Sequence, residues 1–320
     1  MEKKNFGGTG SLLFTNIKWL QNVIPLIGLA ALILFFGILT GFESLGLSNL
    51  KLVFEQSFVL LICSAGVFFV MTMGSLDFSQ GAIVGVASIA VIVFGHDSLL
   101  LGLLAGIVVG FLIGLLNGIL HVYAKIGSFI VTICTMFIFR GVCAFLTTDT
   151  PFSAPIYMYT MNAWAFCIPI VIAILLIGWL ISSKTKLGYQ IRAIGAGETA
   201  AKFSGVNVRV VKILVFVLAG VLAGLAATLN VMRVGSITAS AGTLIETNVM
   251  IALVLGGLPV SGGAKTNFLS VITGVFMLSV LNNGLVMLQI EPNIQQLIRG
   301  LVFLTIVAIT TDRKSTRVIK

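Results

Sequence analysis

The sequence predicts an all-α membrane protein, a bundle of about ten transmembrane helices in a single domain over residues 1–320. Hydrophobic residues make up 58% of the chain and charged residues only 9%, whereas a soluble domain carries roughly 25% charged residues. The apolar residues form unbroken runs, such as residues 24–39, and do not alternate with polar ones as barrel strands do. Because backbone polar groups in lipid must be paired within the structure, helices are the remaining solution.

Ten apolar stretches are long enough to be considered as spans. They lie at about residues 23–41, 55–73, 82–95, 98–120, 127–146, 164–181, 212–230, 244–258, 267–288 and 294–310. The third and the eighth are short for a hydrocarbon core of about 30 Å. We therefore expect these two spans to be tilted, half-length or re-entrant.

The distribution of Lys and Arg predicts the orientation. The longest polar segment, residues 182–212, carries six basic residues and one acid, Glu198, and such segments stay in the cytoplasm. With ten spans, residues 1–22 then form a cytoplasmic N-terminal segment, which lacks the features of a cleaved signal, and residues 311–320 a cytoplasmic tail. Of the 19 basic residues, 15 fall inside and the others at or near the outer ends: Lys51, Arg140, Arg233 and Arg299.

The middle of the polar segment has the composition of a short surface helix. Gly197 precedes it, Glu198 in its first turn favours the helix dipole, and Gly205 suits the position after a helix end. Such a helix between two spans could dock a cytoplasmic partner, or the whole segment could be a plain solvated loop. The candidate docking residues are Gly197, Glu198, Thr199, Ala200, Ala201, Lys202, Phe203, Ser204 and Gly205.

The fourth span carries a glycine at every fourth position. A four-residue step keeps these glycines on nearly one helix face, where another helix can approach closely. The seventh span repeats the pattern with Gly220 and Gly224. The seam could slide during a functional cycle or simply pack statically. Its glycines in the fourth span are Gly102, Gly106, Gly110, Gly114 and Gly118.

Two short stretches that interrupt apolar runs resemble each other. Residues 74–82 and 256–264 both read G-x-L-x-x-S-x-G-A. Paired interruptions of this kind often form the binding site of a transporter. Asp77, in the first stretch, is the most deeply placed acid by this interpretation and could bind a solute, relay protons or cap the helix that begins near Ser79. The candidate pathway residues are Asp77, Phe78, Ser79, Asn117, Ser261, Asn282 and Asn283.

The sequence offers no catalytic, cofactor or metal site. The four cysteines lie in apolar runs and are not spaced with His96 or His121 as metal ligands, so buried, inert thiols are expected. Residues 262–266 are not a phosphate-binding loop, because Ala264 stands before the lysine and no strand precedes it. The net charge of +9 reflects the asymmetry between the two membrane sides and needs no nucleic-acid partner.

Taken together and in order, five segments resemble the membrane permease subunits of ribose-type carbohydrate ABC importers, in the branched-chain amino acid/ribose-type permease family. The resemblance extends over about residues 26–310. Near Asp77 the family usually has G-x-D-L-S-V-G, from which Phe78 and Gln80 depart, and Pro259 replaces a small polar residue. The matching segments are residues 76–85, 188–197, 198–206, 255–263 and 281–285.

The resemblance implies a type II-like ABC importer permease with ten spans, in a prokaryotic cell membrane. It implies a second permease subunit, either a copy of this chain or a paralogue, two cytoplasmic ATPase subunits that bind the ATP, and an extracytoplasmic sugar-binding protein. Residues 197–205 match the family's ATPase-docking segment. The expected mechanism is alternating access of a monosaccharide such as ribose. The alternatives are an ion-coupled secondary transporter of a small polar solute, with Asp77 as the coupling acid, and a non-transporting scaffold or receptor.

Overall fold

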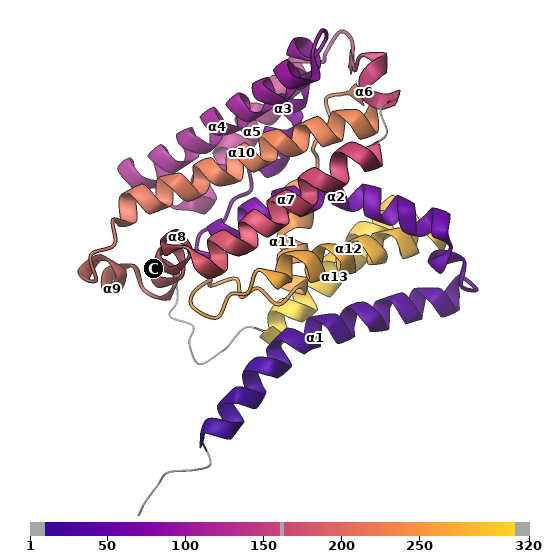
Figure 1. Cartoon of the computed structure of the whole chain (residues 1–320). Helices are drawn as coiled ribbons and strands as arrows, with labels where there is room; N and C mark the ends of the chain where they lie inside the picture. The colour runs from indigo at the N-terminus through magenta and orange to yellow at the C-terminus, as the bar shows by residue number, and fades with distance from the viewer. Residues whose placement is uncertain (1–9, 161–162, 311–320) are drawn as a thin grey trace, which may run out of the picture.

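The computed structural model describes residues 10–160 and 163–310, and in these residues the protein is a bundle of helices (Figure 1). Ten helices coincide with the ten expected spans. They are α1 (Gly10–Leu39), α2 (Leu47–Thr72), α3 (Gln80–Phe94), α4 (Leu99–Tyr123), α5 (Ser128–Leu146), α7 (Ala163–Lys184), α10 (Val208–Val234), α11 (Ile245–Leu255), α12 (Leu269–Met287) and α13 (Pro292–Thr310). The segments expected at 1–22 and 311–320 lie partly or wholly outside the described residues.

Shorter elements connect these helices. They are the 3₁₀ turn η1 (Glu43–Leu45), the helices α6 (Ile156–Thr160), α8 (Lys186–Ala196) and α9 (Glu198–Phe203), and the two-residue strands β1 (Phe152–Ser153) and β2 (Ser236–Ile237). The two strands pair antiparallel, with Phe152 opposite Ile237. This pairing joins the end of α10 to the connection that follows α5.

Within the described residues, six helices are long and apolar enough to cross a bilayer: α2, α4, α5, α7, α10 and α12. The short third and eighth spans are confirmed as short helices, since α3 has 15 residues and α11 only 11. At 1.5 Å per residue, α11 extends over about 16 Å, roughly half of a hydrocarbon core. An all-α polytopic membrane protein with short spans is therefore confirmed.

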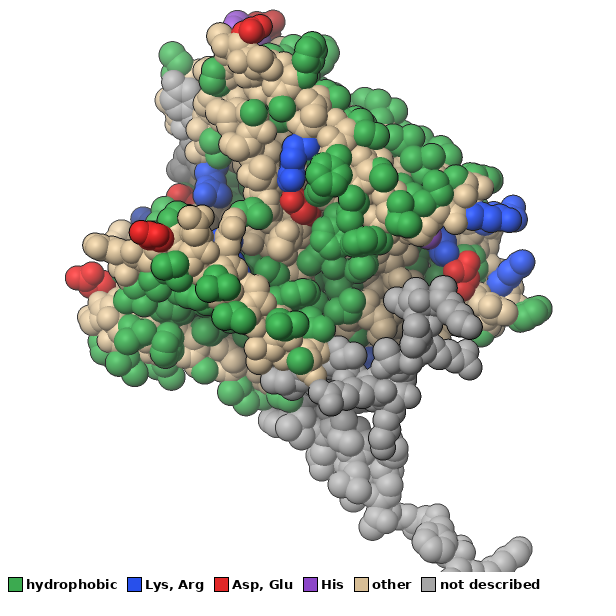
Figure 2. Space-filling model, turned by 180° about the vertical axis from the view of Figure 1, so that it is seen from behind, with side chains coloured by type: hydrophobic (Ala, Val, Ile, Leu, Met, Phe, Trp, Pro, Cys, Tyr) green, Lys and Arg blue, Asp and Glu red, His purple; other side chains and the backbone are tan. Residues whose placement is uncertain are grey.

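Two groups of helices lie on either side of α2, α7 and α11 (Figure 1). One contains α3, α4, α5 and α10, and the other α1, α12 and α13. The most buried of the six long helices is α2, whose Ile62, Val67 and Val70 are fully buried. Hydrophobic side chains cover much of the face shown in Figure 2, and Lys and Arg gather at the edge that carries α9. An apolar girdle with a charged end suits a chain that lies in lipid.

The glycine seam of α4 packs directly against α10. A Cβ atom on Gly110 would lie 2.1 Å from the carbonyl oxygen of Gly220, and one on Gly106 would lie 2.8 Å from that of Gly224. Real Cβ atoms do not approach backbone oxygens so closely, so only glycine allows this contact. The close approach of another helix is thus confirmed, while sliding along the seam stays a prediction.

Candidate functional site

The two interruptions that resemble each other in sequence meet in space. The helix α2 ends at Thr72, and Gly74 follows with a φ of +80°, in the left-handed region that favours glycine. The amide of Gly263 donates a hydrogen bond of 2.9 Å to the carbonyl oxygen of Thr72. A Cβ atom on Gly262 would lie 2.4 Å from the Met71 carbonyl oxygen. The end of the second interruption therefore lies against the start of the first.

The polar segment 182–212 is mostly helical rather than a loop. The helix α7 continues to Lys184, and after Thr185 the chain forms α8, whose Gly188, Ile191 and Ile194 are buried. These buried positions are three apart, so one face of α8 packs against the bundle while the other meets solvent. The many charged residues of this segment make the amphipathic helix difficult to recognise from the sequence.

One residue of α8 joins this helix to both interruptions. A Cβ atom on Gly195 would lie 2.1 Å from the Thr72 carbonyl oxygen and 2.8 Å from the Gly263 amide nitrogen. Gly195, Thr72 and Gly263 therefore form a junction of three backbones, which we call the glycine junction. Any displacement of α8 along this contact must move the end of α2 or the loop after α11, because packed backbones have no room to yield.

The short helix α9 begins at Glu198 as predicted, ends at Phe203, one residue earlier than expected, and projects from the bundle beyond α8 (Figure 1). Gly197 is its N-cap, and Gly205 follows with a φ of +83°. Glu198 forms an ion pair of 2.7 Å with Lys212 of α10. The side chain of Phe203 at the end of α9 is 88% exposed. A single exposed apolar side chain is common on protein surfaces, so docking of a partner on α9 stays a prediction.

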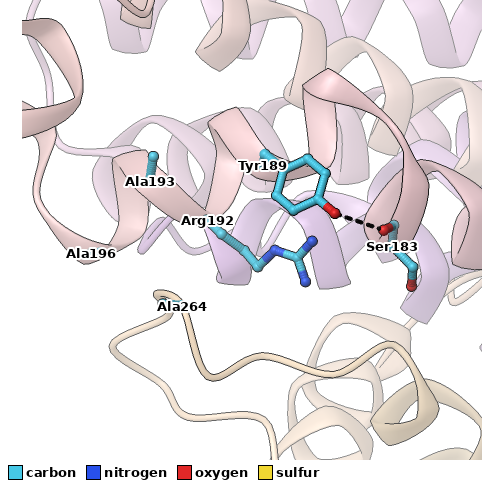
Figure 3. Close-up of a pocket in the computed structure, with 6 residues that line it drawn as sticks. All are labelled: Ser183, Tyr189, Arg192, Ala193, Ala196 and Ala264. Atoms are coloured by element: carbon cyan, nitrogen blue, oxygen red, sulfur yellow. Dashed lines mark hydrogen bonds between the residues drawn. The ribbon is translucent and has the colours of Figure 1, made fainter. Parts of the chain in front are cut away.

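An open cavity of about 500 Å³ lies between α8 and the loop that contains Ala264 (Figure 3). Tyr189 and Arg192 line it, with the guanidinium carbon 5.1 Å from the centre of the tyrosine ring. The Tyr189 hydroxyl donates a 3.3 Å hydrogen bond to the Ser183 carbonyl oxygen. Because α8 also carries Gly195, the cavity borders the glycine junction.

Three of the candidate pathway residues come together at the start of α3. The Asp77 carboxylate accepts hydrogen bonds from the Ser79 amide at 2.9 Å, the Ser79 hydroxyl at 2.6 Å and the Gln80 side chain at 2.7 Å. The Asn117 side chain of α4 donates to the Ser79 hydroxyl at 2.9 Å. Asp77 is 1% exposed and Asn117 equally so. Of the three roles considered for Asp77, this geometry favours a structural one at the start of α3: the carboxylate forms a local turn with Ser79, and Ser79 rather than Asp77 is the N-cap of the helix.

Of the other four candidate residues, Phe78 is next to Asp77 in the chain but contacts a different helix, and Ser261, Asn282 and Asn283 lie elsewhere. The ring of Phe78 packs edge-on against Phe129, with 5.4 Å between centroids. Asn283 exchanges two 2.9 Å hydrogen bonds with Asn49 at the far end of α2 from Thr72. Ser261 is exposed in the loop after α11, and Asn282 is partly buried on α12. The structure does not gather these four around Asp77.

A second buried acid was missed in the sequence, where Asp77 was the only good candidate for an intramembrane acid. Glu246, in the first turn of α11, pairs with Arg140 of α5 at 2.8 Å, and its side chain is 5% exposed. Arg140 was expected near the outer end of the fifth span, and it lies in α5 six residues before the end of that helix at Leu146. The presence of an acidic residue in the short eighth span was the sequence feature that could have identified Glu246 as a second candidate.

The cysteines require one correction, and they hold no metal site in the part of the chain described. Cys63, Cys143 and Cys167 are buried as expected, whereas Cys134 is exposed. Its position in an apolar run did not reveal that α5 turns this side outward. Among residues 10–160 and 163–310, no three His, Cys, Asp or Glu residues are grouped as metal ligands would be.

A multi-pass bundle with two short, interrupted helices and a polar segment linked to both interruptions defines a membrane permease component, which is not itself catalytic. The chain belongs to the family described as "Branched-chain amino acid transport system / permease component", whose model matches residues 49–307.

The similarity to curated relatives extends over most of the chain. The chain is 34% identical over 311 residues to the ribose import permease protein RbsC of Bacillus subtilis (strain 168), and the alignment covers 93% of this chain and 94% of that protein. It is 29% identical over 294 residues to the D-allose transport system permease protein AlsC of Escherichia coli (strain K12), covering 89% of each. The galactofuranose transporter permease protein YtfT of the same strain is 29% identical over 261 residues, covering 79% of this chain and 76% of that protein. No solved structure gives a significant match.

Proposed function

We propose that this chain is the membrane-spanning subunit of an ATP-driven ABC importer for a monosaccharide that resembles ribose. It forms the translocation pathway with a second permease subunit, a copy of itself or a paralogue. An extracytoplasmic binding protein delivers the sugar, and two cytoplasmic ATPase subunits bind the ATP and dock on residues 197–205. The assembly lies in the cell membrane of a prokaryote, with both termini of this chain in the cytoplasm.

The solute class rests on the relatives. The family description names branched-chain amino acids, whereas the three relatives reported above are named for ribose, allose and galactofuranose. These solutes are neutral and carry many hydroxyl groups, so a polar pathway of low net charge suits them.

The coupling to ATPase subunits is supported chiefly by the glycine junction. A partner that pushes on α9 also pushes on α8, because only Gly197 separates these helices. Through Gly195, α8 is packed against the end of α2 and against Gly263. The docking surface is thus mechanically continuous with the two interruptions at which a pathway is expected to open and close.

The resulting mechanism is alternating access. ATP binding can shift the permease between outward and inward states only through its different affinity for the two states. The helices are closely packed, so we expect rigid-body rocking of helix groups rather than local bending. The ion pair between Glu198 and Lys212 links α9 to α10, but it is partly exposed and contributes at most about 1 kcal/mol to this contact.

Transport by the reconstituted complex tests this proposal. The permease is placed in proteoliposomes with its ATPase subunits and binding protein, and uptake of labelled D-ribose, D-allose and L-leucine is measured with and without ATP. We expect ATP-dependent uptake of a sugar that an uncoupler leaves unchanged. Uptake that continues without ATP and stops with an uncoupler would instead establish the ion-coupled alternative, and leucine uptake alone would overturn the sugar assignment.

A further inference from the structure

Arg140 is a charged residue well inside a membrane span. It lies six residues before the end of α5 at Leu146, which is about 9 Å along the helix axis. Its side chain keeps 29% exposure, and its guanidinium group is held by Glu246 rather than extended toward the helix end. A cation at such a depth is strongly disfavoured in contact with lipid tails. The side of α5 that carries Arg140 must therefore face water or protein.

Glu246 fixes the position of this arginine, and Gly81 makes room for Glu246. The Oε1 atom of Glu246 accepts the 2.8 Å hydrogen bond from Nη2 of Arg140. Its Oε2 atom is buried without a partner among the described residues and lies 2.0 Å from where a Cβ of Gly81 would be. Any other residue at position 81 would push the carboxylate away. Gly81 of α3 therefore allows the position of Glu246 of α11, and Glu246 in turn fixes the guanidinium group of Arg140 of α5.

Stability alone does not explain this arrangement. The desolvation of two charges usually cancels most of what a buried ion pair gains. Arginine has five N–H donors, and the described part of the chain provides a hydrogen-bond partner only at Nη2 of Arg140. The Nε donor is buried without a partner among the described residues, so the donors that remain available lie on the two Nη atoms of a side chain that is 29% exposed. Hydroxyl oxygens of a neutral polyol are natural acceptors for such donors.

We propose that Arg140 is a specificity-determining residue of the translocation pathway, where its guanidinium group donates hydrogen bonds to hydroxyl oxygens of the passing solute. Glu246 is the positioning residue that orients Arg140, and Gly81 is required for that position. The identity of the solute as a neutral polyol rests on the proposed function. The exposure of Arg140 to an aqueous pathway does not rest on it.

Thiol labelling tests the pathway without any knowledge of the solute. In a Cys134→Ser background, cysteine is placed at Thr247, the exposed neighbour of Glu246, at Arg140, and, as a lipid-facing control, at Leu112 of α4, whose side chain is 56% exposed. A charged methanethiosulfonate reagent is applied to membranes. Burial in lipid raises the pKa of a thiol, and each unit of increase lowers the concentration of the reactive thiolate about tenfold. We expect the Thr247→Cys and Arg140→Cys variants to react at least that much faster than Leu112→Cys, and equal rates would overturn the proposal.

Reversal of the pair then separates solute binding from a structural role. The double variant Arg140→Glu/Glu246→Arg keeps an ion pair but moves the cation to α11. The folded double variant, separated by size-exclusion chromatography, should take up ribose about tenfold more slowly than the wild type, because it loses hydrogen bonds from a charged donor. Recovery of wild-type uptake would show a purely structural pair. If the double variant does not fold, the labelling of Thr247→Cys decides, and failure of wild-type ribose uptake would count only against the proposed function.

Discussion

Gly195 of α8 lies directly against the carbonyl oxygen of Thr72, the last residue of α2. A Cβ atom added to Gly195 would approach that oxygen to 2.1 Å, and it would also approach the Gly263 amide nitrogen to 2.8 Å. Through this contact, the polar helix that precedes the docking segment touches both helix interruptions at once.

Replacement of Gly195 by alanine should uncouple ATP hydrolysis from transport. The added methyl group must displace α8 from Thr72 and Gly263, while α9 and its surface are unchanged. We expect normal co-purification of the ATPase subunits and a loss of most sugar uptake, measured in proteoliposomes with ATP hydrolysis recorded in parallel. Gly127→Ala is the matched control, because a Cβ there meets nothing within 4 Å. Wild-type uptake by the Gly195→Ala variant would remove the junction from the mechanism.

Changes at the start of α9 should weaken ATPase docking without unfolding the permease. Proline at position 197 cannot adopt the observed φ of 170° and lacks the amide hydrogen that bonds the Ala193 carbonyl oxygen at 3.1 Å. Lysine at position 198 places a second cation beside Lys212, at a stability cost below about 1 kcal/mol because the site is largely exposed. The measurement is co-purification of the ATPase subunits, with Glu43→Lys as an exposed control of the same charge change. Unchanged recovery of the ATPase with both variants would contradict the docking assignment.

The glycine seam should not tolerate a methyl group. In the Gly110→Ala variant the new Cβ would lie 2.1 Å from the Gly220 carbonyl oxygen, and overpacking of this kind costs typically about 1–3 kcal/mol. The control is Gly141→Ala in α5, where a Cβ meets nothing within 4 Å. We expect a lower thermal unfolding temperature in detergent for Gly110→Ala and an unchanged unfolding temperature for the control. Equal temperatures for the two variants would mean that α4 and α10 are less closely packed than described.

Asparagine at position 77 should distinguish a structural turn before α3 from a coupling acid. The asparagine side-chain oxygen can accept the same hydrogen bonds from Ser79 as the carboxylate does, whereas alanine leaves these buried donors without a partner, at a cost of about 1–3 kcal/mol. The Gln80 side-chain oxygen has no partner among the described residues, so after an amide flip it could accept a hydrogen bond from asparagine. We expect most of the sugar uptake to remain in Asp77→Asn and much less in Asp77→Ala. Complete loss of uptake in Asp77→Asn, with the protein still folded, would indicate that the charge itself is needed.

The positions of the spans could be predicted from the sequence, because long apolar runs determine them locally. The third and eighth spans were expected to be short, and α3 and α11 are short. The helical character of residues 186–196 could not be predicted so easily. Its apolar residues are few, and the face that buries Ile191 and Ile194 exists only because α2 and the loop after α11 lie beneath it.

The candidate site was predictable only in part, for a similar reason. Asp77, Ser79 and Asn117 could be chosen as polar residues in or next to apolar runs, and the structure brings them together. Glu246 and Arg140 are 106 residues apart in sequence, and nothing local links them. Asn283 was expected near the pathway, but its partner Asn49 lies in a different helix, which the sequence does not place beside it.

Photo-crosslinking from position 203 tests most directly that α9 is where the ATPase acts on the permease. In one variant, Phe203 is replaced by a photoreactive amino acid. In a second variant, the same amino acid replaces His96, which is exposed in the turn before α4, at the end of the bundle opposite to α9 (Figure 1). Membranes that contain the full complex are irradiated, and the adducts are identified by mass spectrometry. We predict an adduct between position 203 and the ATPase subunit and none from position 96. No ATPase adduct from position 203, or one from position 96, would contradict the account.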